Sequence, residues 1–309
     1  MSQRDVKNRI SSVQNIAKIT RAMEMVAAAR LRRAEQRISA LRPYAGAIRR
    51  MTRQAAEAAG TEIGSLPILQ RHEREGTVAI LLVTGDRGLA GAFNSQILRA
   101  GIRAAQEYES DGKQVTFYAS GRRGISSLAF RGREPAGAYQ GYTDRPAYAD
   151  ARTIAQDLVT AYVDGDVDRV DIFYNGYISP LSQVVRRETL LPLQEATILE
   201  SDEDQDEDAD AGDAGEHGGA EGKHALVDYE PDPAEILERL VPDYVEISIY
   251  RALLESTASE HGARMTAMRN ASENANEVID DLTLEMNRAR QAEITQEIME
   301  VVAGAESLV

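Results

Sequence analysis

"AAARLRRAEQRISALRPYAGAI", residues 27–48, decides the fold, because its apolar residues recur at the spacing of a helix that pairs with another helix. The steps between them alternate between four and three residues, which is the seam of a coiled coil. The seam residues are Ala27, Leu31, Ala34, Ile38, Leu41, Ala45 and Ile48. Residues 3–58 are rich in Ala, Arg, Met and Leu, which favour helix. We therefore expect one long helix, with a bend or a brief break at Pro43.

Upstream of this seam, the same alternation continues one position out of phase. The residues that carry it are Ile16, Ile19, Met23 and Val26. Together with Met25 they spread the apolar surface around most of the helix, which predicts contacts on more than one side.

A second seam runs through residues 243–308, a stretch without Pro that only Gly262 and Gly304 interrupt. Its residues are His261, Met265, Met268, Ser272, Ala275, Ile279, Leu282, Met286 and Ala289. Helices of this length are longer than a compact domain needs. We expect the two terminal helices to form a shaft as an antiparallel coiled coil. The end of the second helix, residues 294–309, is then expected to extend alone past the N-terminus.

The middle of the chain alternates strand-like and helix-like patterns. "TVAILLV", residues 77–83, is apolar on both faces, as a strand inside a parallel sheet is. Further strand patterns begin at Gln114, Val170 and Gln183, with helical stretches at 122–129 and 146–163 between them. Alternation of this kind predicts a small open α/β (Rossmann-like) domain, inserted between the two helices.

Four segments follow from these patterns. They are an N-terminal coiled-coil helix (1–60), the α/β domain (76–199), an acidic segment (200–227) and a C-terminal coiled-coil helix (228–309). Residues 1–60 carry 13 basic and 4 acidic residues, whereas residues 200–227 carry 1 and 11. The acidic segment has too few apolar side chains to offset its ordering entropy, so we expect it to be disordered or solvated.

Few features of the sequence indicate a nucleotide-binding, metal-binding or catalytic site. The spacing of Gly85, Gly88 and Gly91 matches neither dinucleotide nor P-loop patterns, so a tight turn from strand to helix is the favoured interpretation. Asp206, Asp208 and Asp210 lack the Gly and Glu that a calcium loop requires further on. The chain has no Cys, and its four His are scattered. We expect no metal, no cofactor and no catalytic site.

Other partners are also limited by the composition. The basic first segment lacks the interleaved aromatic residues of a nucleic-acid surface and would lie beside an acidic helix. No apolar run approaches the roughly 18 residues of a membrane span. A coiled-coil scaffold and, more distantly, a nucleotide-binding α/β protein remain as alternatives.

Four stretches carry a resemblance to a known family. They are "NIAKITRAMEMVAAARLRRAE" (15–35), "TGDRGLAGAFN" (84–94), the stretch 230–275 beginning "EPDPAEILERL", and "RARQAEITQEIMEVVAGAES" (288–307). They resemble the gamma subunit of F-type ATP synthases, of the bacterial type. The match covers nearly the whole chain, apart from residues 200–225.

The resemblance implies a non-catalytic rotor of a proton-translocating ATP synthase. Its shaft would turn inside a hexamer of alpha and beta subunits, and its foot would contact the epsilon subunit and the c-ring. Membrane association would then be indirect, at the cytoplasmic face of the plasma membrane. The family's chloroplast members carry a redox-active Cys pair, which this chain lacks.

The resemblance also assigns residues by motif. The positions expected to contact the alpha and beta subunits are Lys18, Met23, Arg30, Arg33, Arg290, Gln291 and Thr295. The last helical turns, around residues 301–305, are expected to offer a narrow apolar tip that turns within the hexamer.

Overall fold

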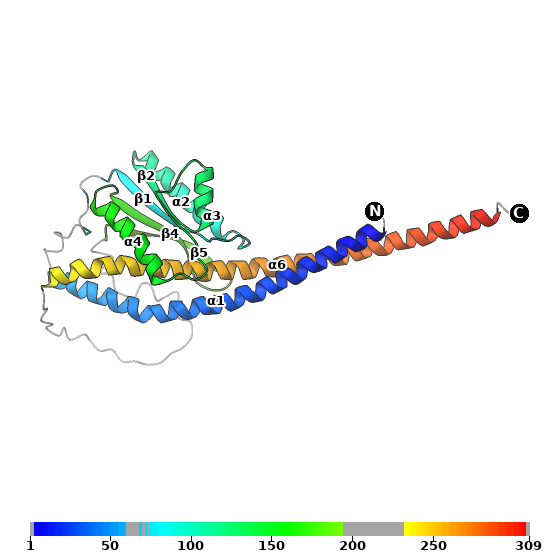
Figure 1. Cartoon of the computed structure of the whole chain (residues 1–309), viewed down its shortest axis with the longest axis horizontal. Helices are drawn as coiled ribbons and strands as arrows, with labels where there is room; N and C mark the ends of the chain where they lie inside the picture. The colour runs from blue at the N-terminus through cyan, green and yellow to red at the C-terminus, as the bar shows by residue number, and fades with distance from the viewer. Residues whose placement is uncertain (1–2, 60–67, 70–71, 73–74, 194–231, 307–309) are drawn as a thin grey trace. The chain divides into compact units, whose positions relative to one another are not determined.

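The computed structural model describes residues 3–59, 68–69, 72, 75–193 and 232–306. The acidic segment predicted at residues 200–227 lies outside these ranges, so the predicted domain boundaries stay a prediction. In chain order the elements are α1 (Gln3–Ala59), β1 (Thr77–Val83), α2 (Phe93–Ser110), β2 (Gln114–Ser120), α3 (Arg122–Phe130), β3 (Gly137–Tyr139), α4 (Tyr148–Val163), β4 (Arg169–Tyr177), β5 (Gln183–Leu191) and α6 (Pro233–Glu306) (Figure 1).

The chain forms two compact units. Residues 1–29 and 264–309 make the coiled-coil unit, and residues 30–263 make the α/β unit. Helices α1 and α6 each contribute to both units. Helix α1 is continuous through Pro43, so the brief break considered from the sequence is absent. Among the described residues, no helix is both long and apolar enough to cross a membrane.

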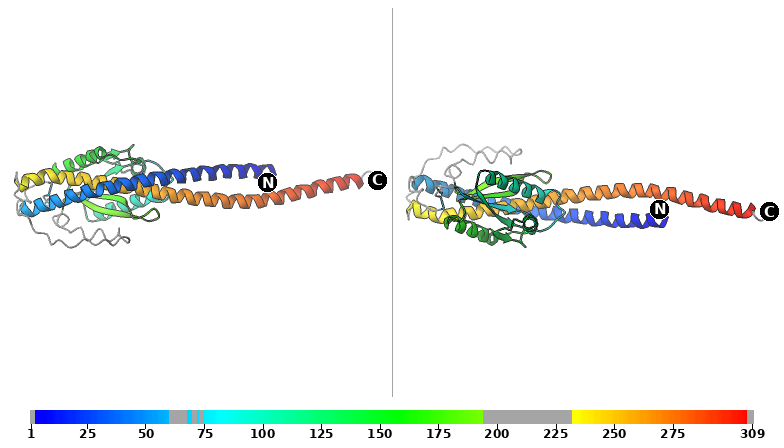
Figure 2. Two further views of the ribbon diagram at one scale, coloured as in Figure 1. Left: turned by 90° about the horizontal axis from the view of Figure 1, so that it is seen from below. Right: turned by 90° about the horizontal axis from the view of Figure 1, so that it is seen from above.

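In the coiled-coil unit, the first turns of α1 pack against the far part of α6, antiparallel to it (Figure 1, Figure 2). Val6 and Ile10 are buried against Leu282, with Ile279 and Met286 packed beside them. These α6 residues belong to the second predicted seam, and the seam prediction is confirmed here.

The α1 seam continues upstream in the phase of Ala27. Its further positions are Val6, Ile10, Val13, Ala17, Thr20 and Glu24. The out-of-phase set is therefore outside the seam, and Ile16, Ile19 and Val26 are 52%, 59% and 53% exposed. Upstream of Ala27 the buried residues keep the alternating steps of four and three, so the residues one position out of phase lie off the seam.

The α/β unit contains one sheet with strand order β3-β2-β1-β4-β5. Strands β1, β2, β3 and β4 run parallel to one another. Strand β5 pairs with β4 and is antiparallel to it. The sheet has an apolar core on each face, as the sequence of β1 predicted. Val78, Ile80 and Leu82 face the core shared with α2 and α3. The alternate residues of β1 face the core that includes α1, α4 and α6 residues.

A glycine allows the ends of β1 and β2 to lie close to the start of α3. Gly121 has φ of +94°, and a Cβ placed there would lie 2.1 Å from the carbonyl oxygen of Thr84. The Thr84 hydroxyl donates to the Ser120 carbonyl at 2.8 Å and accepts from the Gly124 amide at 2.9 Å. A side chain at residue 121 would break this contact between strand and helix.

Candidate functional site

The coiled-coil unit exposes large apolar side chains on both of its helices. On α1 the exposed large apolar side chains are Ile16, Ile19, Met25 and Val26; on α6 they are Val278, Leu284, Ile294, Ile298, Met299, Val301 and Val302. Isolated exposed apolar residues are ordinary, but a stripe along one helix marks an interaction surface. We call Ile16, Ile19, Met23 and Val26 the outer stripe of α1; Met23 is half-buried.

Beside the outer stripe, two positions of the α1 seam are occupied by polar residues. Thr20 and Glu24 are 9% and 8% exposed. The Thr20 hydroxyl donates to the Ile16 carbonyl at 3.1 Å. Glu24 accepts from Arg21 Nη1 and from Arg269 Nε of α6, both at 3.0 Å. The helix thus directs its larger apolar side chains outward and buries the carboxylate of Glu24, which is the reverse of what packing against α6 alone would favour.

Beyond its pairing with α1, helix α6 continues unaccompanied. From Gln291 to Ala303 every described side chain is exposed. The α6 residues that pack on Val6 are around Leu282 and Met286, so the exposed stretch lies past the start of α1. Figure 1 shows the C-terminal end of α6 extending past the N-terminus, as the sequence predicted.

The seven residues assigned by motif differ in their surroundings. Lys18, Arg33, Arg290, Gln291 and Thr295 are exposed, and Met23 is half-buried on the outer stripe. Arg30 is already paired, because its Nη1 lies 2.7 Å from Asp144 Oδ2. Nothing in the chain itself tests whether the seven contact other subunits, so this assignment stays a prediction.

In the α/β unit, the glycine-rich turn is held by an aspartate. Asp86 accepts from the backbone amides of Arg122 and Gly141, both at 2.9 Å, and from the Thr143 hydroxyl at 3.0 Å. The carboxylate therefore lies at the start of α3, where a helix would otherwise favour a phosphate. A hollow of about 260 Å³ beside it is lined by Asp86, Arg87, Arg122, Gln140, Gly141 and Asp144. The stretch with Gly85, Gly88 and Gly91 therefore forms a structural turn, which is the interpretation that its spacing favoured.

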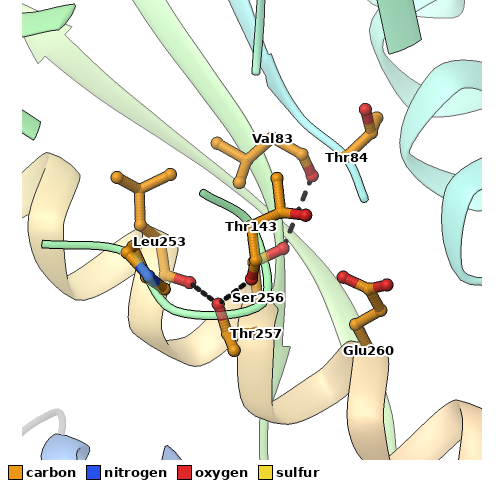
Figure 3. A pocket seen from close by; sticks show the side chains of 8 residues that line it. Val83, Thr84, Thr143, Leu253, Ser256, Thr257 and Glu260 are labelled. Carbon is orange, nitrogen blue, oxygen red and sulfur yellow. Dashed lines mark hydrogen bonds between the residues drawn. The ribbon is translucent and has the colours of Figure 1, made fainter. Parts of the chain in front are cut away.

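A second hollow lies between the end of β1 and α6 (Figure 3). Its polar lining is already hydrogen-bonded: the Thr257 hydroxyl is 2.9 Å from the Thr143 carbonyl and 2.8 Å from the Leu253 carbonyl. Its interior of about 10 Å³ has room for roughly one water molecule. This space is too small for a substrate.

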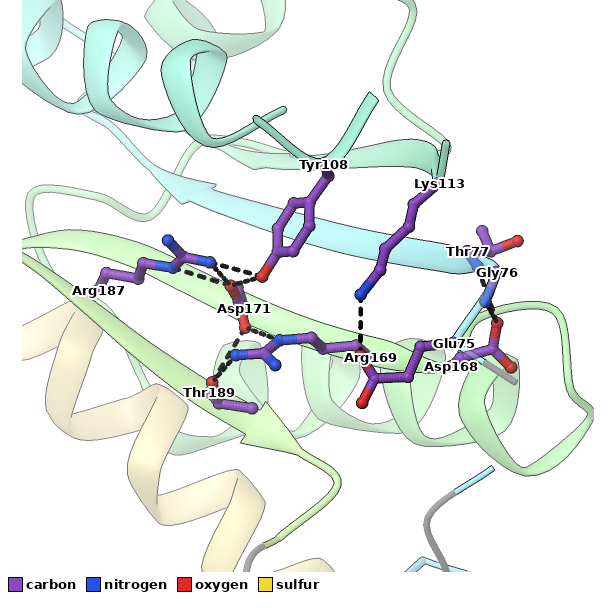
Figure 4. Close-up of polar contacts among 10 residues, drawn as sticks. All are labelled: Glu75, Gly76, Thr77, Tyr108, Lys113, Asp168, Arg169, Asp171, Arg187 and Thr189. Atoms are coloured by element: carbon purple, nitrogen blue, oxygen red, sulfur yellow. Dashed lines mark hydrogen bonds and ion pairs between the residues drawn. The ribbon is translucent and has the colours of Figure 1, made fainter. Parts of the chain in front are cut away.

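A charged network lies on β4 and β5, next to the end of α2 (Figure 4). Asp171, fully buried, accepts from Tyr108 at 2.7 Å and from Arg169 and Arg187, each at 2.9 Å. Burial alone would raise the pKa of Asp171, but the Tyr108 hydrogen bond and the two guanidinium groups outweigh it and lower that pKa. Burial and the neighbouring carboxylate raise the pKa of Tyr108 to about 12.

This network has the properties of a structural element. The two guanidinium groups share the carboxylate of Asp171, and no nucleophile and general base are brought together there. Among the residues that the structure describes, no group of three or more His, Cys, Asp or Glu could hold a metal ion.

Comparisons with known proteins cover nearly the whole chain. The family model described as ATP synthase matches residues 2–308. The ATP synthase gamma chain of Rubrobacter xylanophilus is 43% identical over 99% of this chain and 98% of its own length.

Solved structures give the same result. The chain matches one from the Tetrahymena thermophila mitochondrial ATP synthase central stalk and c-ring with a TM-score of 0.56 and 25% identity, covering 82% of this chain and 99% of that one. A chain of the Euglena gracilis mitochondrial ATP synthase, 18% identical, shares the fold with a TM-score of 0.64 over 99% of this chain and 94% of that one. The chain therefore belongs to the gamma-chain family of ATP synthases, the non-catalytic subunits that form the central-stalk rotor of the F-type complex.

Proposed function

We propose that the outer stripe of α1 and the unaccompanied end of α6 bear on the alpha and beta subunits of the catalytic hexamer. The observation that carries this proposal is the phase of α1. The helix leaves Ile16, Ile19 and Val26 more than half exposed while Glu24 takes a place in the seam. An apolar stripe that no described part of the chain covers is stabilised when another subunit covers it.

Torque would follow from contacts that differ between the beta subunits. A rotor that presents one apolar stripe on one side of its shaft meets the three beta subunits in three different ways. A contact that stabilises one conformation of a beta subunit more than another shifts its nucleotide affinity. Rotation would then move each beta subunit through its affinity states in turn, with Lys18, Arg290 and Thr295 among the contacts.

We assign a different set of partners to the α/β unit. Its exposed apolar side chains include Phe130 at 91% and Leu181 at 72%, on α3 and on the turn between β4 and β5. We assign the epsilon subunit and the c-ring to this unit by family membership. The chain would therefore associate with the cytoplasmic face of the plasma membrane only through its partners.

The double variant I16Q/I19Q tests the contact with the hexamer. Both side chains are about half exposed in the chain, so a covering subunit would bury roughly half of each, worth about 1 kcal/mol per side chain. Losing about 2 kcal/mol weakens the contact roughly 30-fold. We expect proton pumping per ATP hydrolysed to fall in the assembled complex, while the fold of the chain, followed by circular dichroism, is unchanged.

V163Q is the control, because Val163 is 48% exposed at the end of α4 and the change also replaces a branched apolar side chain by Gln. It should leave the coupling of pumping to hydrolysis at the wild-type value. An I16Q/I19Q complex that pumps as many protons per ATP as the wild type would contradict the proposed contact.

A further inference from the structure

One carboxylate of α6 is enclosed within the α/β unit. Every residue of α6 from 252 to 262 is buried, so this part of the helix is covered on all sides. Glu255 belongs to this stretch and is 9% exposed. A side chain on a covered helix cannot extend its charged end to water, so groups inside the unit must balance the charge.

Two strands face the Glu255 carboxyl. Arg186 Nη1 of β5 lies 3.8 Å from Glu255 Oε2, which makes an ion pair but is too long for a hydrogen bond. Oε2 is buried and accepts a hydrogen bond from none of the described residues. From β4, the backbone amide of Tyr177 donates to the carboxyl, while the Tyr177 hydroxyl donates to Glu35 of α1.

The second arginine of this cluster binds another carboxylate. Arg251, one turn before Glu255 on α6, donates from Nη2 to Glu188 Oε2 at 2.6 Å. The other oxygen of Glu188 accepts from the Tyr174 hydroxyl at 2.5 Å. The two arginines and two glutamates therefore balance in number, but the close contacts go to Glu188. Oε2 of Glu255 is left with Arg186 at 3.8 Å.

Arg186 reaches Glu255 across a glycine. Its side chain lies over Gly176 of β4, where a Cβ would be 2.5 Å from Arg186 Nε. The Arg186 side chain is 36% exposed, so water screens its charge, and it offsets only part of the cost of a buried carboxylate. Burial accordingly raises the pKa of Glu255, against the opposing effect of the two arginines. The neighbouring carboxylate of Glu188 raises this pKa further.

We propose that the Glu255 carboxyl is a proton-binding site, in which the proton and Arg186 compete for Oε2. This inference goes beyond the rotor function and does not depend on it. When Oε2 holds the proton, the carboxyl is neutral and Arg186 is free to turn to water. When the proton leaves to solvent, the carboxylate draws Arg186 onto it, and the ion pair attaches β5 to α6. The attachment of this strand to the long helix thus depends on pH.

Carbon NMR of the full-length chain with labelled Glu side chains measures the site directly. The signal that E255Q lacks identifies the Glu255 Cδ. We expect it to titrate at a higher pH than the Cδ signals of exposed glutamates such as Glu238. R186Q removes the competing cation, so it should move the Glu255 midpoint to higher pH. G176A should act in the same direction, because its Cβ would overlap Arg186.

Urea unfolding of E255Q and the wild type gives a second measurement that needs no change at Arg186. Because the pKa of Glu255 is raised in the folded chain, the stability that its protonated form contributes is present below the unfolded value of about 4.3. That stability is lost as the pH rises through the folded value. E255Q cannot ionise, so its urea midpoint should rise relative to that of the wild type over this interval and stay higher above it.

R239Q is the matched control, because Arg239 is an exposed arginine on the same helix, paired with Glu235. It should leave the Glu255 midpoint unchanged. The proposal is overturned if Glu255 titrates together with the exposed glutamates, or if R186Q and G176A both leave its midpoint at the wild-type value. An equal shift in R239Q would also overturn it, since the effect would then belong to the net charge and not to Arg186.

Discussion

Replacing Asp171 by Asn should destabilise the α/β unit strongly, although the substitution changes the side-chain volume very little. Asp171 is fully buried, and its carboxylate is the common acceptor for Tyr108, Arg169 and Arg187. The variant leaves the guanidinium groups of Arg169 and Arg187 without the carboxylate that they share. An amide also cannot accept from all three donors, since its nitrogen is itself a donor.

The size of the effect follows from the exposure of the partners. Removing one member of a buried ion pair costs about 3–5 kcal/mol. The Arg187 side chain is 40% exposed and the Arg169 side chain 21%, so water screens part of the charge that is left. We therefore expect a loss of about 3 kcal/mol in the free energy of unfolding, at the lower end of this range.

Urea unfolding of the full chain measures this loss. The chain has 12 Tyr and no Trp, and every Tyr lies between residues 44 and 250, so the near-ultraviolet signal reports on the α/β unit. A loss of about 3 kcal/mol should lower the midpoint by at least about 1 M urea. D111N, at an exposed position after α2, is the matched control and should stay within about 0.5 kcal/mol of the wild type.

The pH dependence provides an independent check. The pKa of Asp171 is lowered in the folded chain, so its contribution is present above the unfolded value of about 3.9 and is lost as the pH falls through the folded value. The difference between D171N and the wild type should therefore shrink below about pH 4. A D171N midpoint no lower than that of D111N at pH 7 would refute the reasoning.

Two further predictions concern the strand-to-helix contact and the seam. G121A should destabilise the α/β unit by about 3 kcal/mol or more, because φ of +94° disfavours any Cβ and this one would overlap the Thr84 carbonyl; an unchanged urea midpoint would argue against it. R269M should loosen the coiled-coil unit by about 1–2 kcal/mol, because it leaves Glu24 in the seam without its partner from α6. Hydrogen exchange of residues 3–29 would report the loosening, and E24Q/R269M should recover part of the protection; a double variant worse than R269M would contradict this account.

The sequence by itself determined the parts of the fold that rest on local periodicity. The alternation of four and three residues from Ala27 to Ile48 and the seam at residues 261–289 each predict a long helix that pairs with another helix. In the structure the second seam packs on the first turns of α1, and Ala45 and Ile48 share a core with the start of α6. The run of apolar residues in β1 predicts a strand covered on both faces, as the two cores confirm. Each of these patterns is complete within a short stretch, so no knowledge of distant residues is needed to interpret it.

The assigned contact residues depended on motifs alone, and periodicity did not identify them. For Arg30 the tertiary structure adds a partner, Asp144, that lies far away in the sequence. No local pattern around either residue predicts this pair. The same holds for Asp86, whose carboxylate connects the start of α3 to Gly141 and Thr143.

Only the tertiary structure decided which face of α1 is buried near its N-terminus. Two apolar alternations overlap between Ile16 and Ala27, and hydrophobicity alone favours the one that is exposed in the fold. Contacts with α6 decide the buried face, because Leu282 packs on Val6 and Ile10 and because Arg269 supplies the charge that lets Glu24 occupy the seam. The outer stripe therefore arises from a constraint imposed by residues that are not its neighbours in the sequence.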